Sequence, residues 1–230
     1  MPHSSTTRIL AIRHGETAWN VDARIQGQLD IGLNSTGQWQ ARRLAEALAG
    51  GGQDGQIDMI YSSDLCRAFD TATAVAASTQ GPLQQDAGLR ERHFGAFQGR
   101  TPDEIAALYP EQVLSWRQRD PDFCPEGGES LHTFYARCVS TAARLAARHP
   151  GQTIALVAHG GVLDCLYRAA CGMPIEAPRG WQLGNASINR LLYTGDTFTM
   201  IGWGDTQHLE GAGLDEISEA PVQRVVGSLS

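Results

Sequence analysis

The residues of this sequence best suited to chemistry are two histidines and two arginines that lie far apart along the chain. His14 could act as a nucleophile, and Arg13 is its neighbour. Arg13 and Arg67 carry guanidinium groups, whose planar forks of N–H donors match the oxygens of a phosphate. His159 adds another donor, and Gly160 adds backbone N–H groups if it opens a helix. Together these groups suit transfer of a phosphoryl group, because its equatorial oxygens need positive charge around them.

Glu91 completes this candidate set with a carboxyl group. Cations near His14 would disfavour its imidazolium form and keep it neutral and nucleophilic, while Glu91 could protonate the leaving oxygen and then act as base toward water. Each residue alone has a simpler interpretation. An Arg–His pair at a strand end is usually a turn feature, Arg67 and Glu91 would ordinarily face solvent, and His159 could cap a helix. The functional interpretation therefore depends on a fold that brings these residues together.

Three apolar segments predict buried strands that could do so: residues 8–12, 57–61 and 153–158. They end at the polar segments 13–15, 62–64 and 159–161 respectively. Apolar residues at helical spacing follow each polar segment, with helices predicted after Asn34, after Ser62 or Ser63 as N-cap, after residue 130 and from 160 to 171. Strands alternating with helices imply an α/β fold with a mostly parallel sheet, and ligands bind at the carboxyl ends of such strands.

The rest of the chain adds smaller elements and no linker to a second domain, so residues 1–230 are predicted to form a single domain. Residues 187–193 and 198–203 predict a terminal hairpin around Gly195-Asp196, and residues 102–116 predict short helices. Residues 99–128 could form a cap over the site, and the tail from about 216 to 230 is expected to be mobile. Within the cap, five residues could line an apolar wall or pack internally: Leu108, Tyr109, Leu114, Trp116 and Phe123.

Composition excludes several broad classes of protein. The chain has 230 residues, of which 42% are hydrophobic, enough for a sizeable core, and its net charge of −7 argues against general nucleic-acid binding. The chain has five cysteines, an odd number, and no two of them form a Cys-x-x-Cys motif. This favours reduced thiols and a cytoplasmic protein. The apolar run at residues 9–12 is too short for a signal peptide or membrane span, so no membrane partner is expected.

A resemblance to a known family sharpens these expectations. Residues 13–17, Arg-His-Gly-Glu-Thr, followed by Trp19-Asn20, resemble the signature of the histidine phosphatase superfamily, also called the phosphoglycerate mutase-like family. Further blocks resemble the family in the same order along residues 8–208: Gln26-Gly27, Leu33-Asn34, residues 61–68, Leu89-Arg90-Glu91 with Phe94-Gly95, residues 127–130, and residues 158–161. Gln98 departs from it, because related phosphatases often have glutamate there.

The resemblance implies a three-layer sandwich, with helices on both faces of the mostly parallel sheet, and a role for each site residue. It implies that His14 is phosphorylated, that Arg13 and Arg67 bind phosphoryl oxygens, and that His159 supports the transferring group. It also implies that Glu91 is the proton donor. The substrate-binding set is then Arg13, Asn20, Gln26, Gly27, Arg67, Glu91 and Gly160. The family needs no metal and no cofactor.

The function expected from sequence is that of a metal-independent phosphatase of the histidine acid phosphatase type, acting on a small phosphorylated metabolite. A phosphoglycerate mutase is the main alternative, because residues 91–96 resemble the mutase version of that block; the short segment between Glu91 and His159 favours the phosphatase. A non-catalytic phosphate-binding protein is a further alternative. A metal hydrolase is disfavoured by the fixed cation beside His14, and a serine hydrolase by the lack of a Gly-x-Ser-x-Gly motif. A homodimer remains open.

Overall fold

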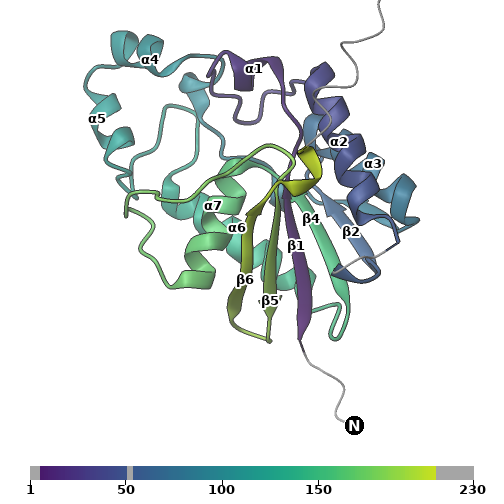
Figure 1. The fold of residues 1–230 in the computed structure, drawn as a ribbon. Helices are drawn as coiled ribbons and strands as arrows, with labels where there is room; N and C mark the ends of the chain where they lie inside the picture. The colour runs from purple at the N-terminus through teal and green to yellow at the C-terminus, as the bar shows by residue number, and fades with distance from the viewer. Residues whose placement is uncertain (1–5, 51–53, 211–230) are drawn as a thin grey trace, which may run out of the picture.

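A six-stranded sheet forms the centre of the computed structural model, which describes residues 6–50 and 54–210 (Figure 1). Its strands run in the order β3-β2-β4-β1-β5-β6. The first four along the chain pair in parallel, whereas β5 is antiparallel to β1 and β6 is antiparallel to β5. The α/β fold and the terminal hairpin are therefore confirmed. The strand bounds are β1 (Thr7–Arg13), β2 (Met59–Ser62), β3 (Leu83–Gln85), β4 (Thr153–Ala158), β5 (Ile188–Tyr193) and β6 (Phe198–Asp205).

Helices cover both faces of this sheet, as a three-layer sandwich requires. Figure 1 shows α2 and α3 on one side and α6 and α7 on the other, with α1, α4 and α5 at the end of the sheet where β1 ends. The helix bounds are α1 (Ala18–Val21), α2 (Ser35–Leu48), α3 (Cys66–Thr79), α4 (Pro102–Leu108), α5 (Gln112–Arg117), α6 (Leu131–Ala146) and α7 (Gly160–Cys171). Within the described ranges, no helix combines the length and apolar character needed to cross a membrane.

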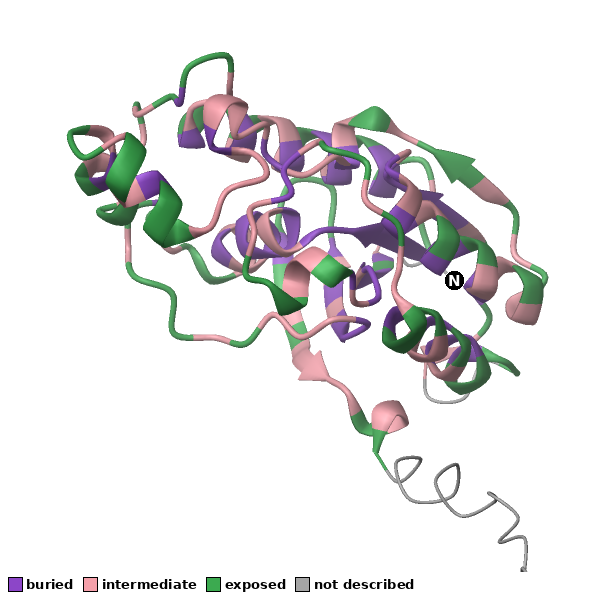
Figure 2. Cartoon of the chain, turned by 90° about the horizontal axis from the view of Figure 1, so that it is seen from above, coloured by how far each residue is buried: buried purple, intermediate pink, exposed green. Residues whose placement is uncertain are grey.

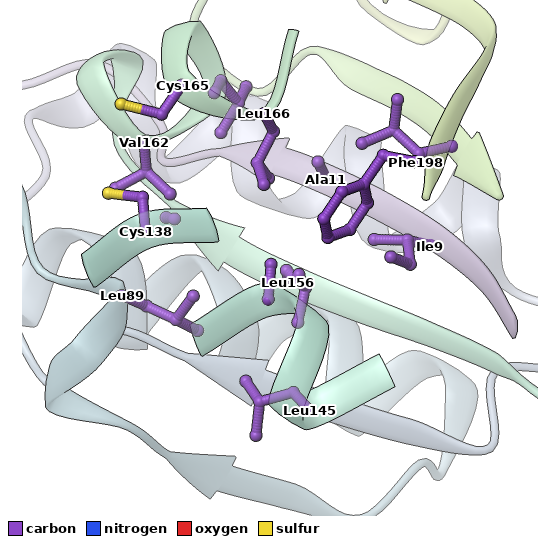
Figure 3. Packing of buried hydrophobic residues seen from close by; sticks show 14 of the residues in the cluster. Ile9, Ala11, Leu89, Cys138, Leu145, Leu156, Val162, Cys165, Leu166 and Phe198 are labelled. Carbon is purple, nitrogen blue, oxygen red and sulfur yellow. The ribbon is translucent and has the colours of Figure 1, made fainter. Parts of the chain in front are cut away.

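Two hydrophobic clusters hold the layers together. The larger one joins α6 and α7 to the sheet through residues such as Ile9, Leu156 and Leu166 (Figure 3). The other joins α2 and α3 to the opposite face, where Leu44 and Ile60 are fully buried. Figure 2 shows buried residues gathered along the sheet and the inner faces of these helices. Because β1 and β4 are covered on both faces, their carboxyl ends are held firmly in place.

Helix ends match the sequence prediction in most places and contradict it at α3. Asn34 caps α2 by accepting a hydrogen bond from the Gly37 amide, and α7 ends at Gly172 in the left-handed conformation. The prediction that Ser62 or Ser63 caps α3 is wrong. The N-cap is Leu65, two or three residues later, and Asp30 from a distant loop accepts the Cys66 amide hydrogen bond at 2.7 Å.

Residues 99–128 contain α4 and α5 and pack around a small hydrophobic cluster centred on Phe97, to which Ile25 and Phe94 also contribute. The rings of Tyr109, Trp116 and Phe123 have their centroids 5.2, 5.7 and 6.0 Å from that of Phe97. Tyr109 and Phe123 therefore pack internally, whereas Trp116 packs in this cluster and also lines the cavity described below. Leu108 and Leu114 are 58% and 60% exposed. The tail predicted to be mobile, residues 216–230, lies outside the described residues.

Candidate active site

The carboxyl ends of β1 and β4 bring the two histidines together. His14 follows β1 directly and His159 follows β4, and the His14 amide donates to the Ala158 carbonyl at 3.0 Å. Their ring centroids are 5.2 Å apart, with the planes at 58°. The sequence predicted that strands of one sheet would bring these residues together. The two strands are direct neighbours, and their register, which pairs Arg13 with Ala158, sets His14 beside His159.

The protonation of His14 is set by one short hydrogen bond. Its Nδ1 lies 2.6 Å from the Gly15 carbonyl oxygen. Because a carbonyl only accepts, Nδ1 carries the proton, and Nε2 keeps its lone pair. Burial first, and then the positive charges of Arg13 and Arg67, hold the pKa of His14 well below its ordinary value. A neutral imidazole with a free Nε2 lone pair is the form a nucleophile requires.

Three buried hydrogen-bond donors near His14 have no partner among residues 6–50 and 54–210. Arg13 Nε, Arg67 Nε and His159 Nδ1 are all buried and make no hydrogen bond to a described residue. The other guanidinium nitrogens of Arg67 donate to the carbonyls of Leu29 and Gly27 at 2.9 and 2.7 Å, which fixes its orientation. Arg13 is oriented in the same way by the Leu183 carbonyl. Because a buried donor without an acceptor is costly, this arrangement fits an anion among these groups.

Ser63 orients His159, a role that sequence reasoning missed. His159 Nε2 lies 2.9 Å from Ser63 Oγ, which also accepts the Leu65 amide hydrogen bond at 3.3 Å. Since that oxygen already accepts from Leu65, its own proton is free to go to Nε2, and the proton of a neutral His159 then lies on Nδ1. Burial and nearby positive charge, chiefly that of Arg67, hold the pKa of His159 well below its ordinary value. His159 thereby presents a neutral N–H donor.

Glu91 reaches the site from a loop and is fixed by two backbone amides. The Arg92 amide donates to Oε1 at 2.8 Å, and the Gly161 amide in the first turn of α7 donates to Oε2 at 2.9 Å. A Cβ at position 161 would lie 2.1 Å from Glu91 Oε1. Glycine is therefore required at Gly161 for this carboxylate to stand beside the helix.

A cavity of about 210 Å³ joins these groups. The predicted residues Asn20, Gln26 and Gly27 line it, and Gln26 Oε1 is buried without a partner among the described residues. Gln98 helps to shape this loop, because its Oε1 accepts the Gln28 amide hydrogen bond at 2.8 Å. The complete lining is Arg13, His14, Asn20, Arg24, Ile25, Gln26, Gly27, Arg67, Glu91, Phe94, Trp116 and Gly160.

The same region offers no ligand set for a metal ion. Among residues 6–50 and 54–210, no group of three or more His, Cys, Asp or Glu side chains is arranged to hold one. The donors that converge on His14 are cationic or neutral N–H groups, which suit an anion.

The low pKa values of the two histidines predict that the fold loses stability in mild acid. As the pH falls through about 6.5, the unfolded chain binds protons at these histidines before the folded protein does, so the free energy of unfolding decreases. Each histidine contributes a slope of up to about 1.4 kcal/mol per pH unit below that value. Urea unfolding between about pH 7.5 and 5.5 measures this, and His14→Gln should flatten the slope. Equal stability across that range would contradict the burial of neutral histidines.

Comparison with known proteins agrees with this geometry. The model of the histidine phosphatase superfamily (branch 1) matches residues 9–206. Phosphoglycerate mutase-like protein 4 of Arabidopsis thaliana is 42% identical over 90% of this chain and 88% of its own. The metal-independent phosphoserine phosphatase of that plant is 35% identical over 92% and 87%. A mycobacterial glucosyl-3-phosphoglycerate phosphatase, solved in complex with VO3, superposes with a TM-score of 0.75 at 37% identity, over 86% of this chain and 99% of that one. The chain belongs to the histidine phosphatase superfamily.

Proposed function

We propose that this protein is a metal-independent phosphatase that hydrolyses a small phosphomonoester through a phosphohistidine on His14. The observation that carries the proposal is a group of buried donors near His14 without a partner among the described residues: Arg13 Nε and Arg67 Nε, whose side chains line the same cavity, and Nδ1 of the adjoining His159. Two of its relatives are named phosphatases, one of them metal-independent. The five cysteines are free, which suits the cytoplasmic setting we propose.

In the first step of the proposed reaction, the lone pair of His14 Nε2 attacks phosphorus and the bond to the alcohol oxygen breaks. Arg13, Arg67 and the His159 Nδ1–H stabilise the three equatorial oxygens. Glu91, in its protonated form, gives its proton to the leaving oxygen.

In the second step, Glu91 as carboxylate takes a proton from water. The resulting oxygen attacks the phosphorus of phosphohistidine, and the N–P electron pair returns to Nε2. Inorganic phosphate leaves, and both His14 and Glu91 regain their starting protonation states.

Hydrolysis in ¹⁸O-labelled water tests this proposal against its alternatives. The enzyme, with EDTA present, should release phosphate from 4-nitrophenyl phosphate and from alkyl phosphates, with one labelled oxygen in each phosphate and none in the alcohol or phenol. It should convert little 3-phosphoglycerate to 2-phosphoglycerate, with or without 2,3-bisphosphoglycerate.

Three results would contradict the proposal. Fast, bisphosphate-dependent interconversion would identify a mutase. Phosphate binding without turnover would identify a non-catalytic protein. Recovery of activity only on adding a divalent ion to the EDTA-treated protein would identify a metal hydrolase.

A further inference from the structure

Residues 127–130, Gly-Gly-Glu-Ser, lie against the irregular loop of residues 90–94 that carries Glu91. The amide of Glu129 donates to the His93 carbonyl at 2.8 Å. A Cβ at position 128 would lie 2.6 Å from that carbonyl oxygen, so glycine is required for the two backbone segments to approach this closely. The start of α6 is therefore held directly against the loop, two residues beyond Glu91.

Arg137 reaches the same loop from α6. Its Nη1 donates to the carbonyls of Gly88 and Arg90 at 3.0 and 2.9 Å, and its Nη2 donates to the Glu91 carbonyl at 3.3 Å. Its Cζ lies 5.1 Å from the centroid of the Phe134 ring, which packs against the guanidinium group. One planar guanidinium group therefore fixes three backbone carbonyls of the segment that ends at Glu91.

Glu129 joins Arg137 to the other side of the loop. The two side chains form a two-pronged ion pair, in which Arg137 Nε donates to Glu129 Oε1 at 2.9 Å and Nη2 donates to Oε2 at 2.8 Å. Oε2 also accepts the His93 amide hydrogen bond at 2.8 Å. The side chains of Arg137 and Glu129 are only 23% and 18% exposed, so solvent screens the pair weakly. The ion pair thus binds backbone both before and after the Glu91 side chain.

We propose that Arg137 and Glu129 are positioning residues for proton transfer by Glu91, because they hold the backbone on both sides of it. The amides of Arg92 and Gly161 hold the Glu91 side chain best as a carboxylate, and a proton on either oxygen weakens one of these bonds. The bonds from Arg137 and Glu129 to the backbone do not depend on that proton, so they keep Glu91 in place through both steps of the reaction. This inference rests on the proposed function, because it concerns the proton donor of that reaction.

Arg137→Gln is expected to lower kcat/KM for propyl phosphate by at least about tenfold, since a displacement of about 1 Å can cost roughly 10²-fold in rate. kcat/KM for 4-nitrophenyl phosphate should fall by less than about threefold, because its phenolate leaves without a proton. Arg144→Gln is the matched control. Arg144 lies on the same helix, pairs with Asp86 at 2.7 Å and does not line the cavity at His14, so its variant should keep the wild-type ratio of the two values. Equal losses for the two substrates in Arg137→Gln, or equal ratios in the two variants, would overturn the inference.

A double-mutant cycle with Glu91→Gln separates positioning from a general disturbance of the fold. Once residue 91 cannot donate a proton, its placement no longer matters, so adding Arg137→Gln should change the ratio of kcat/KM values by less than about twofold. An undiminished change of the ratio would show that Arg137 acts through another group and would overturn the inference.

A second variant keeps the test decisive if Arg137→Gln alone does not fold. Arg137→Gln leaves the Glu129 carboxylate without its cationic partner, whereas adding Glu129→Gln gives a neutral pair and removes that unpaired charge. The variant with both changes should show the same selective loss with propyl phosphate. Its absence would overturn the inference as firmly as its absence in the single variant.

The same assays separate failure of this inference from failure of the proposed function. If wild-type protein hydrolyses both substrates and Glu91→Gln loses mainly the propyl phosphate activity, an unselective Arg137→Gln refutes the positioning role alone. If wild-type protein does not hydrolyse 4-nitrophenyl phosphate, the phosphatase itself is refuted, and the positioning role with it.

Discussion

His14→Ala is expected to reduce kcat by at least about 10⁴-fold, because covalent catalysis disappears with its nucleophile. The substitution leaves the cationic groups of Arg13 and Arg67 in place, so phosphate should still compete for the cavity. A substrate labelled in its phosphoryl group should label wild-type protein on His14, in an adduct that is stable in base and labile in acid. Rapid-quench labelling followed by peptide mapping measures this directly.

His132→Ala provides the control for loss of a histidine. Its side chain is 61% exposed and pairs with Asp122 away from the cavity, so kcat should stay near the wild-type value. A labelled residue other than His14, or a His14→Ala protein that retains activity, would refute the proposed mechanism.

Glu91→Gln is expected to reduce the hydrolysis of alkyl phosphates by about 10²-fold or more, and that of 4-nitrophenyl phosphate far less. An alkoxide leaves poorly without a proton, whereas 4-nitrophenolate needs none. The substitution also brings a side-chain N–H₂ against one of two backbone donors, the Arg92 or the Gly161 amide, which disturbs the position of residue 91.

The two classes of substrate separate these effects of Glu91→Gln. A disturbance of position lowers both rates together, whereas loss of the proton donor lowers only the alkyl rate. The measurement is kcat/KM for both classes with wild type and variant. Equal losses for the two classes would show that Glu91 only positions other groups.

The parts of the site that sequence predicted are those attached to regular elements. His14 and His159 follow continuous apolar segments, and the carboxyl ends of neighbouring parallel strands share one edge. Arg67 lies in the first turn of α3, which was predicted within a few residues even though its cap was not. The burial of Arg67, at 1% exposed, exceeds the usual expectation for an arginine on a helix, and only the carbonyls of Gly27 and Leu29 explain it.

The parts that sequence could not predict are contacts between distant loops. Asp30 caps α3 from a separate loop, so no local pattern around Cys66 reveals it. Gly161 donates its amide hydrogen bond to Glu91, which lies seventy positions earlier in the chain. The sequence Gly160-Gly161 predicts the start of a helix, but it does not reveal that a carboxylate lies against that helix. Asp164 in α7 and Arg119, two residues after the end of α5, likewise meet across 45 positions of chain. The spacing of apolar residues predicts which face of a single helix or strand is buried. Contacts between distant loops depend on how several helices, strands and loops are placed relative to one another.

The separate packing of residues 99–128 has an evolutionary consequence. Phe97, Ile105 and Val113 form a cluster distinct from the two that join helices to the sheet. Substitutions within it can therefore accumulate without repacking the strand ends that carry His14 and His159. Trp116 packs against this cluster and also lines the cavity at His14, so substitutions in the cluster reach the substrate through it. A lineage with this architecture can acquire new substrates by neutral change in one segment and inherit its phosphoryl-transfer chemistry unaltered.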